Sequence, residues 1–236
     1  MSLSESEKQR EYYRRTAADY EAMHLAEGDE HYVALAFLSA MISHHGFKSV
    51  LDVGSGTGRA LAYLKARHPD VRFVGIEPVK ELREVGHRAG LSPAELMDGD
   101  ALALEHPAGA FDLVCEFAVL HHVRTPSAVV DEMLRVASRA VFISDCNNFG
   151  QGGVAARFLK QSLDRLGLWP LANWIKTRGR GYSESEGDGL FYSYSVFNDL
   201  PAIRRACRKV HLLNTAGGPS GNLYRTAPHV AVLGLK

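Results

Sequence analysis

Short apolar runs and amphipathic segments alternate along the first 145 residues of the chain. Continuous apolar runs are typical of strands buried on both faces, and apolar residues three or four positions apart are typical of helices. The pattern predicts strands at 49–54, 71–77, 94–98, 111–117 and 140–145, and helices at 5–27, 30–45, 59–67, 78–89 and 126–138. Strands that alternate with helices indicate a parallel sheet covered on both faces.

The alternation stops after Asp145 and returns near residue 199. Residues 146–200 contain two helical pieces and a segment rich in Gly, Ser and Tyr, which we predict to be a loop. A helix at 199–207 and two strands at 209–214 and 229–236, joined by a turn, complete the chain as an antiparallel pair. An irregular insertion of this length is usually functional, as a lid or a substrate pocket.

These elements predict an α/β fold: a doubly wound, mostly parallel, Rossmann-like sheet of seven strands with the last strand antiparallel. The insertion precedes the last helix. The predicted division is an N-terminal helical lid at 1–46, a cofactor-binding core at 47–145, an inserted substrate cap at 146–200 and a C-terminal completion of the sheet at 201–236.

Composition narrows the class of protein. The chain has 236 residues, 46% of them apolar and 23% charged, which is enough apolar material for a sizeable core. It carries 27 basic and 27 acidic residues, and this balance disfavours a protein that coats nucleic acid. The charge is uneven, because residues 1–150 carry an acidic excess and residues 151–236 a basic one. The second half is therefore the better place to look for an anion-binding surface.

The three cysteines form no CxxC pair, which argues against a disulfide framework or a zinc knuckle and favours a reducing compartment. The first residues have no apolar targeting segment, and no run of about 18 apolar residues occurs. We therefore expect a soluble cytoplasmic protein with a small-molecule substrate and with neither a nucleic-acid nor a membrane partner.

The segment Leu51–Arg59 decides the class of ligand. It places G-x-G-x-G, two residues after Asp52, where the first strand turns into a helix. Glycines there let the backbone approach a ligand, and the helix start offers free N–H groups. A dinucleotide motif would need glycine at the position of Arg59, so a nicotinamide oxidoreductase is disfavoured. Glu77 ends the second strand, where an acid can accept both ribose hydroxyls.

Over residues 45–145 the chain resembles the class I S-adenosylmethionine-dependent methyltransferases, in particular their small-molecule branch. The resemblance implies S-adenosyl-L-methionine as cofactor and S-adenosyl-L-homocysteine as product. It implies that the glycine loop cradles the methionine part, that Glu77 holds the ribose, and that the segment at Asp100 flanks the adenine. The implied cofactor residues are Asp52, Gly54, Ser55, Gly56, Gly58, Glu77, Pro78, Asp100, Ala101, Glu116, Phe117 and, in an N-terminal segment that folds over the cofactor, Tyr20. The chain departs from that branch at residues 136–140, which lack its Pro-Gly-Gly.

Candidate acid–base groups follow the fourth and fifth strands. Methyl transfer to a hydroxyl benefits from a base of near-neutral pKa, so we predict catalytic roles for His121, His122 and Asp145. Asn147 and Asn148 follow at the rim where substrate should lie. Oxygen ligands here could suit magnesium, but the spacing is not that of catechol-type enzymes, and we predict no metal.

Two motifs that are absent from the sequence narrow the class of molecule that accepts the methyl group. No Asn/Asp-Pro-Pro-Tyr segment and no Pro-Cys follow the fourth strand, which disfavours methylation of nucleic-acid bases. We predict O-methylation of a small metabolite, with Arg178 and Arg180 orienting an anionic group and Tyr192 in an aromatic wall. Methylation at nitrogen or carbon, or a non-catalytic protein that senses or regulates through the same cofactor, stays open as an alternative.

Overall fold

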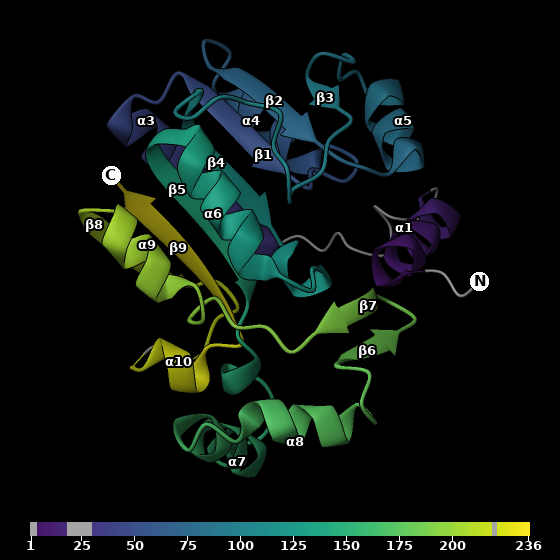
Figure 1. The fold of residues 1–236 in the computed structure, drawn as a ribbon. Helices are drawn as coiled ribbons and strands as arrows, with labels where there is room; N and C mark the ends of the chain where they lie inside the picture. Colours follow the sequence, from purple (N-terminus) through teal and green to yellow (C-terminus); the bar gives the residue numbers. More distant parts are fainter. Residues whose placement is uncertain (1–3, 18–29, 219–220) are drawn as a thin grey trace.

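The computed structural model describes residues 4–17, 30–218 and 221–236. Its main sheet has the strand order β3-β2-β1-β4-β5-β9-β8 (Figure 1). Strand β9 runs antiparallel between β5 and β8, and the other described pairings are parallel. The predicted fold class is confirmed. The strands are β1 (Ser49–Val53), β2 (Arg72–Ile76), β3 (Leu96–Met97), β4 (Phe111–Phe117), β5 (Ala137–Cys146), β8 (Lys209–Asn214) and β9 (His229–Leu235).

Helices cover both faces of this sheet and divide its apolar side chains into two cores. Helices α3 (Glu30–His45) and α4 (Arg59–Arg67) supply one core, and α6 (Pro126–Val136) and α9 (Leu200–Ala206) supply the other. Parallel strands buried between two such layers need continuous apolar sequence, which explains the runs found along the chain.

The start of the helix predicted at 78–89 differs in the structure, whereas the start of the first helix agrees. Helix α5 (Lys80–Arg88) begins after Pro78 and Val79, because the Glu77 carboxylate accepts the Val79 N–H at 2.9 Å and holds this stretch outside the helix. Helix α1 (Glu5–Thr16) starts where expected, with Ser4 and Glu7 forming a reciprocal cap. Tyr20 lies outside the described residues.

The insertion contains more regular structure than predicted. Helices α7 (Val154–Arg165) and α8 (Trp169–Lys176) are followed by a hairpin of β6 (Tyr182–Ser185) and β7 (Gly189–Tyr192). The prediction of a loop here was wrong: aromatic residues pair across the hairpin, and the interspersed glycines and serines hide the strand pattern. A short helix, α10 (Leu223–Thr226), also follows α9, so the helix directly after the insertion is not the last one, as predicted, but the one before it.

Helix α1 packs against α5 and the hairpin rather than against the sheet (Figure 1). Gln9 accepts the N–H of Leu190, and Tyr12 donates to the carbonyl of Glu186 at 2.8 Å. The N-terminal helix and the hairpin, far apart in sequence, therefore form one wall above the carboxyl ends of the strands.

Candidate active site

The loop after β1 is shaped by three glycines. Gly54, Gly56 and Gly58 have φ of 73°, 56° and 79°, a region that side chains disfavour. A Cβ on Gly54 would also lie 2.5 Å from a methyl carbon of Val119. Glycine is thus required at Gly54 both for the turn and for the space it leaves to Val119, and the backbone of Gly54 and Gly56, the glycine cradle, lines a cavity.

Glu77 joins this loop to the end of β2. Its buried carboxylate accepts the N–H groups of Gly56 at 3.0 Å and Val79 at 2.9 Å. Burial raises the pKa of Glu77 to about 7, although these two hydrogen bonds act in the opposite direction. Each carboxylate oxygen can accept a further bond, so Glu77 can still bind a ligand's hydroxyl groups.

A cavity of about 850 Å³ opens above the loop. Its walls come from the strand ends, from α1 and from the hairpin. Seven of the predicted cofactor residues and one predicted substrate residue line it: Gly54, Gly56, Glu77, Pro78, Asp100, Ala101, Phe117 and Tyr192. The predicted N-terminal segment contributes through α1, but sequence reasoning missed its polar residues Lys8, Gln9 and Arg10 in this wall. These positions look like an ordinary polar helix face until the hairpin is in place.

Asp100 lines this cavity and is bound by helix α1. Its carboxylate accepts from Arg10 at 3.1 Å and from the Leu102 N–H at 2.9 Å. Helix α1 therefore closes over the segment that the sequence assigns to the adenine.

Four predicted cofactor residues lie behind the cavity wall. Glu116 is fully buried and bridges β4 and β5 by accepting the N–H groups of Val119 and Ser144. Burial, with Asp145 nearby, holds the pKa of Glu116 well above its usual range. Asp52 is buried beside Cys115, and burial raises its pKa to about 6. Asp52, Ser55, Gly58 and Glu116 do not line the two cavities described here.

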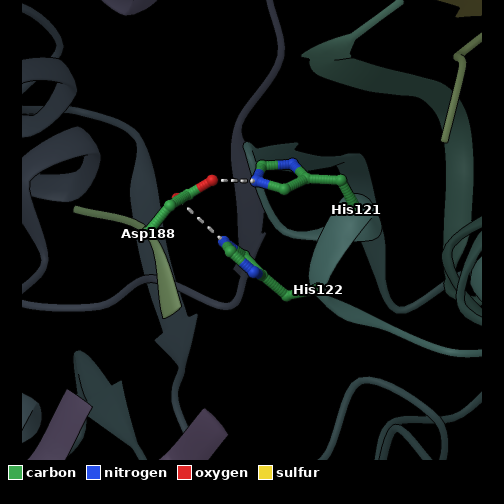
Figure 2. A group of neighbouring side chains, drawn as sticks. All are labelled: His121, His122 and Asp188. Carbon is green, nitrogen blue, oxygen red and sulfur yellow. Dashed lines mark ion pairs between the residues drawn. The ribbon is translucent and has the colours of Figure 1, made fainter. Parts of the chain in front are cut away.

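Two histidines and a carboxylate form a cluster (Figure 2), and all three line one cavity together with Thr57 of the glycine loop. His121 and His122 lie on a short 3-10 turn after β4, and Asp188 comes from the hairpin turn. The Asp188 carboxylate lies 3.6 Å from Nε2 of His121 and 3.4 Å from Nε2 of His122. No local motif marks Asp188, and sequence reasoning missed it.

His121 is the charged histidine of this pair. Its Nδ1 lies 2.7 Å from Oδ1 of Asp145, which is fully buried and also accepts the Leu120 N–H at 2.8 Å. Burial opposes the charge, but Asp145 and Asp188 outweigh it and raise the pKa of His121 to about 10. Burial likewise favours neutral Asp145, but His121 outweighs it and lowers the pKa of Asp145 to about 2.

His122 has the opposite character. Its Nδ1 lies 2.7 Å from the Leu190 carbonyl and donates to it. Burial and the positive charge of His121 lower the pKa of His122, so it is neutral at pH 7 with an unprotonated Nε2. His122 lines both the large cavity and a second one of about 290 Å³ beside it.

The second cavity contains a buried polar atom. Among the described residues, Oγ1 of Thr57 has no hydrogen-bond partner. The ammonium and carboxylate of a methionine group would satisfy such an atom next to the glycine loop. The two Nε2 atoms and Asp188 are also close enough to ligate a cation, although the charge on His121 already compensates Asp188.

The other predicted substrate residues lie elsewhere. Asn147 is fully buried, and its amide group holds the carbonyls of Leu223 and Ala227 and accepts from Ser195. Asn148, Arg178 and Arg180 line neither cavity, and both arginines are exposed after α8.

Comparisons with known proteins agree with this geometry. A family model described as "Methyltransferase domain" matches residues 51–143. An uncharacterized methyltransferase of Mycobacterium tuberculosis is 34% identical over 148 residues, covering 61% of this chain and 66% of the relative. The chain thus spans slightly less than two thirds of that relative's length. Phosphatidylethanolamine N-methyltransferase of Cereibacter sphaeroides is 32% identical over 122 residues, covering 50% of this chain and 59% of that protein.

A solved structure shows the same fold over nearly the whole chain. Magnesium protoporphyrin IX methyltransferase of Synechocystis, with bound S-adenosylhomocysteine, superposes with a TM-score of 0.62 at 14% identity, covering 99% of this chain and 100% of that one. The glycine cradle, the Glu77 carboxylate and the unsatisfied Thr57 hydroxyl fit S-adenosylmethionine, which is the cofactor of this chain. Together, the family model, the relatives and the shared fold support a class I S-adenosylmethionine-dependent methyltransferase.

Proposed function

We propose that this protein transfers a methyl group from S-adenosylmethionine to an oxygen atom of a small-molecule acceptor. The observation that carries the proposal is the position of His122, a neutral histidine at the junction of the two cavities. When bound, the cofactor supplies an electrophilic methyl group on a sulfonium. Backbone groups of the glycine loop and the Glu77 carboxylate hold it, and the side chains around His122 position the acceptor.

In this proposal His122 acts as the base. Its Nδ1–H is committed to the Leu190 carbonyl, so the lone pair on Nε2 accepts the acceptor's hydroxyl proton. The resulting imidazolium lies 3.4 Å from Asp188, whose negative charge stabilises it. His121 and Asp145 fix the 3-10 turn that carries His122, since the Asp145 carboxylate holds both the imidazole of His121 and the backbone of Leu120.

The acceptor is proposed to be enclosed by α1 and the hairpin. Tyr13, Tyr182 and Tyr192 supply aromatic surface in the large cavity, and Lys8 lies among them, 3.1 Å from the Tyr182 hydroxyl. An aromatic wall next to the Lys8 ammonium favours a small, weakly acidic molecule such as a phenol or an enol. Arg178 and Arg180 line neither cavity, so the proposal gives them no role in binding the acceptor.

Methylation at nitrogen is the second candidate, favoured by the phosphatidylethanolamine N-methyltransferase among the relatives. A neutral His122 can also take a proton from an ammonium or amine acceptor. The two candidates differ in the product, because an O-methyl and an N-methyl group are distinguished by the carbon shift in NMR.

The test is turnover of isotopically labelled cofactor. Purified protein incubated with methyl-labelled S-adenosylmethionine and fractionated small-molecule extracts should form S-adenosylhomocysteine together with one labelled product. The control is Glu77→Ala, which should bind cofactor weakly and form less of both. Tight cofactor binding without product from any extract would contradict the enzymatic proposal and support a sensor.

A further inference from the structure

Helix α7 turns its polar side chains toward the protein. Lys160 donates to the carbonyls of Asn148 and Gln151, and Gln161 donates to the carbonyls of Phe149 and Arg225. Asp164 accepts from the Tyr224 hydroxyl. The interface between α7 and the rest of the chain is therefore a network of hydrogen bonds, and no residue of α7 is buried.

The opposite face of α7 is apolar and in water. Val154, Phe158 and Leu159 are 75%, 73% and 60% exposed. An ordinary surface helix has the reverse arrangement, with apolar residues inward and polar residues outward. Exposing these side chains opposes folding unless another body covers them.

Helix α8 extends the same feature. Its Leu171, Trp174 and Ile175 are 56%, 59% and 63% exposed, and their spacing of three and four positions puts them on one side of the helix. Helices α7 and α8 contact each other and lie together beyond the hairpin, away from β2 and β3 (Figure 1). We call the following eight residues the insertion face: Val154, Phe158, Leu159, Leu166, Leu168, Leu171, Trp174 and Ile175.

The exposed apolar side chains of the described residues are concentrated on the insertion face. Among the described residues, only four other large apolar side chains are exposed, and their exposed fractions of 36–45% compare with 45–75% on the insertion face. Single exposed apolar residues are common, but a group of this size on neighbouring helices marks an interaction surface.

The charges around the insertion face have one sign. Arg165, Lys176, Arg178 and Arg180 are exposed, and the only acid between residues 154 and 180 is Asp164, which is bound to Tyr224. Apolar and aromatic residues bordered by cations are typical of helices that lie in the headgroup region of a bilayer.

The same charges disfavour a second copy of the chain as the occupant. A two-fold interface brings one surface against itself, so these cations would face their own copies without acids to neutralise them. An anionic lipid surface instead complements them.

We propose that the insertion face docks on the surface of an anionic phospholipid bilayer, with α7 and α8 lying in the headgroup region. The sequence alone predicts no membrane partner, because it offers no long apolar run. No helix among the described residues is long and apolar enough to cross a membrane, so the contact is peripheral. The segment after α8 leads to Tyr182 in the cavity wall, so docking brings the cavity near the bilayer.

The test is co-sedimentation of the full-length protein with vesicles of phosphatidylcholine, with and without phosphatidylglycerol. It needs neither cofactor nor acceptor, so its failure is distinct from a failure of the proposed methyl transfer. The protein should bind the phosphatidylglycerol vesicles, and added salt should weaken binding.

Two pairs of substitutions separate the apolar from the ionic contribution. Phe158→Ser with Trp174→Ser should lower vesicle affinity by at least about tenfold, because two large apolar side chains no longer enter the lipid. Lys176→Gln with Arg178→Gln should lower affinity for anionic vesicles by roughly thirtyfold and affect neutral vesicles little. The matched control, Tyr32→Ser with Val33→Ser on α3, changes two exposed apolar residues outside the insertion face and should bind as wild type.

Two results would overturn the proposal. One is wild-type protein that stays in the supernatant with phosphatidylglycerol vesicles. The other is a dimer in light scattering that Phe158→Ser with Trp174→Ser converts to a monomer while vesicle binding is absent, which would make the insertion face an interface between copies. Cofactor affinity measured on each variant verifies that it is folded.

Discussion

Helices α4 and α7 are both amphipathic, yet they place their apolar residues in opposite directions. In α4, Ala60, Leu61 and Leu64 are buried against the sheet, and Lys65 and Arg67 face water. In α7, Phe158 and Leu159 face water, and Lys160 is held inside by backbone carbonyls. Amphipathic spacing therefore shows that a helix has two faces, but the neighbouring elements decide which face is covered.

The comparison extends to the site. The cofactor cradle of the core is built from residues close together in the chain. The insertion, more than sixty residues further along, supplies Asp188, the Leu190 carbonyl and one wall of the cavity. Each region can be changed by itself, so the contribution of each can be measured.

The largest expected effect is a loss of kcat on replacing His122, where the core and the insertion meet. His122→Gln should lower kcat by roughly 10²–10⁴-fold while leaving cofactor affinity near wild type, because the amide cannot take a proton. Steady-state kinetics and calorimetry check this. His44→Gln, an exposed histidine at the end of α3, is the control. A loss of less than tenfold would show that the reaction depends on positioning alone.

The next largest effect is a difference in unfolding free energy between substitutions in α4 and in α7. Leu64→Ala in α4 should cost about 2–5 kcal/mol of unfolding free energy, because a fully buried side chain is removed from a packed core. Leu159→Ala in α7 should change it by less than about 0.5 kcal/mol, since the side chain is 60% exposed. Chemical denaturation measures both. Equal losses would contradict the inside-out arrangement of α7.

Cofactor affinity tests the core alone. Glu77→Ala should weaken S-adenosylmethionine binding by roughly 10- to 100-fold, the range for losing hydrogen bonds to a charged group. Glu95→Ala, just before β3 and paired with Lys65 outside both cavities, is a control that should bind normally. Unchanged affinity in isothermal titration of Glu77→Ala would remove the ribose role from this residue.

The smallest expected effect is a shift in the pH dependence of kcat. A base must be unprotonated, so activity should fall as pH decreases through the pKa of His122, which burial and His121 hold below its ordinary value. Asp188 acts against this lowering, so Asp188→Asn should move the acid limb to lower pH still. Glu186→Gln in the same turn should leave the limb in place. A move to higher pH in Asp188→Asn would contradict the assigned base.

The sequence by itself determined the sheet, the glycine cradle and Glu77. These depend on local properties: apolar runs form buried strands, a left-handed turn requires glycine, and an acid at the end of β2 stands next to the loop after β1 in any parallel sheet. For the same reason the sequence placed His121 and His122 correctly after β4. It did not show that one of them is charged and the other neutral.

Only the tertiary structure decided the rest. It placed Asp188 against two histidines more than sixty residues away, placed α1 on the hairpin, and drew Asn147 into hydrogen bonds that hold α10. It also turned the apolar face of α7 outward. Burial, charge compensation and cavity shape arise from contacts between segments far apart in the chain, and no local pattern of residues encodes which segments will meet.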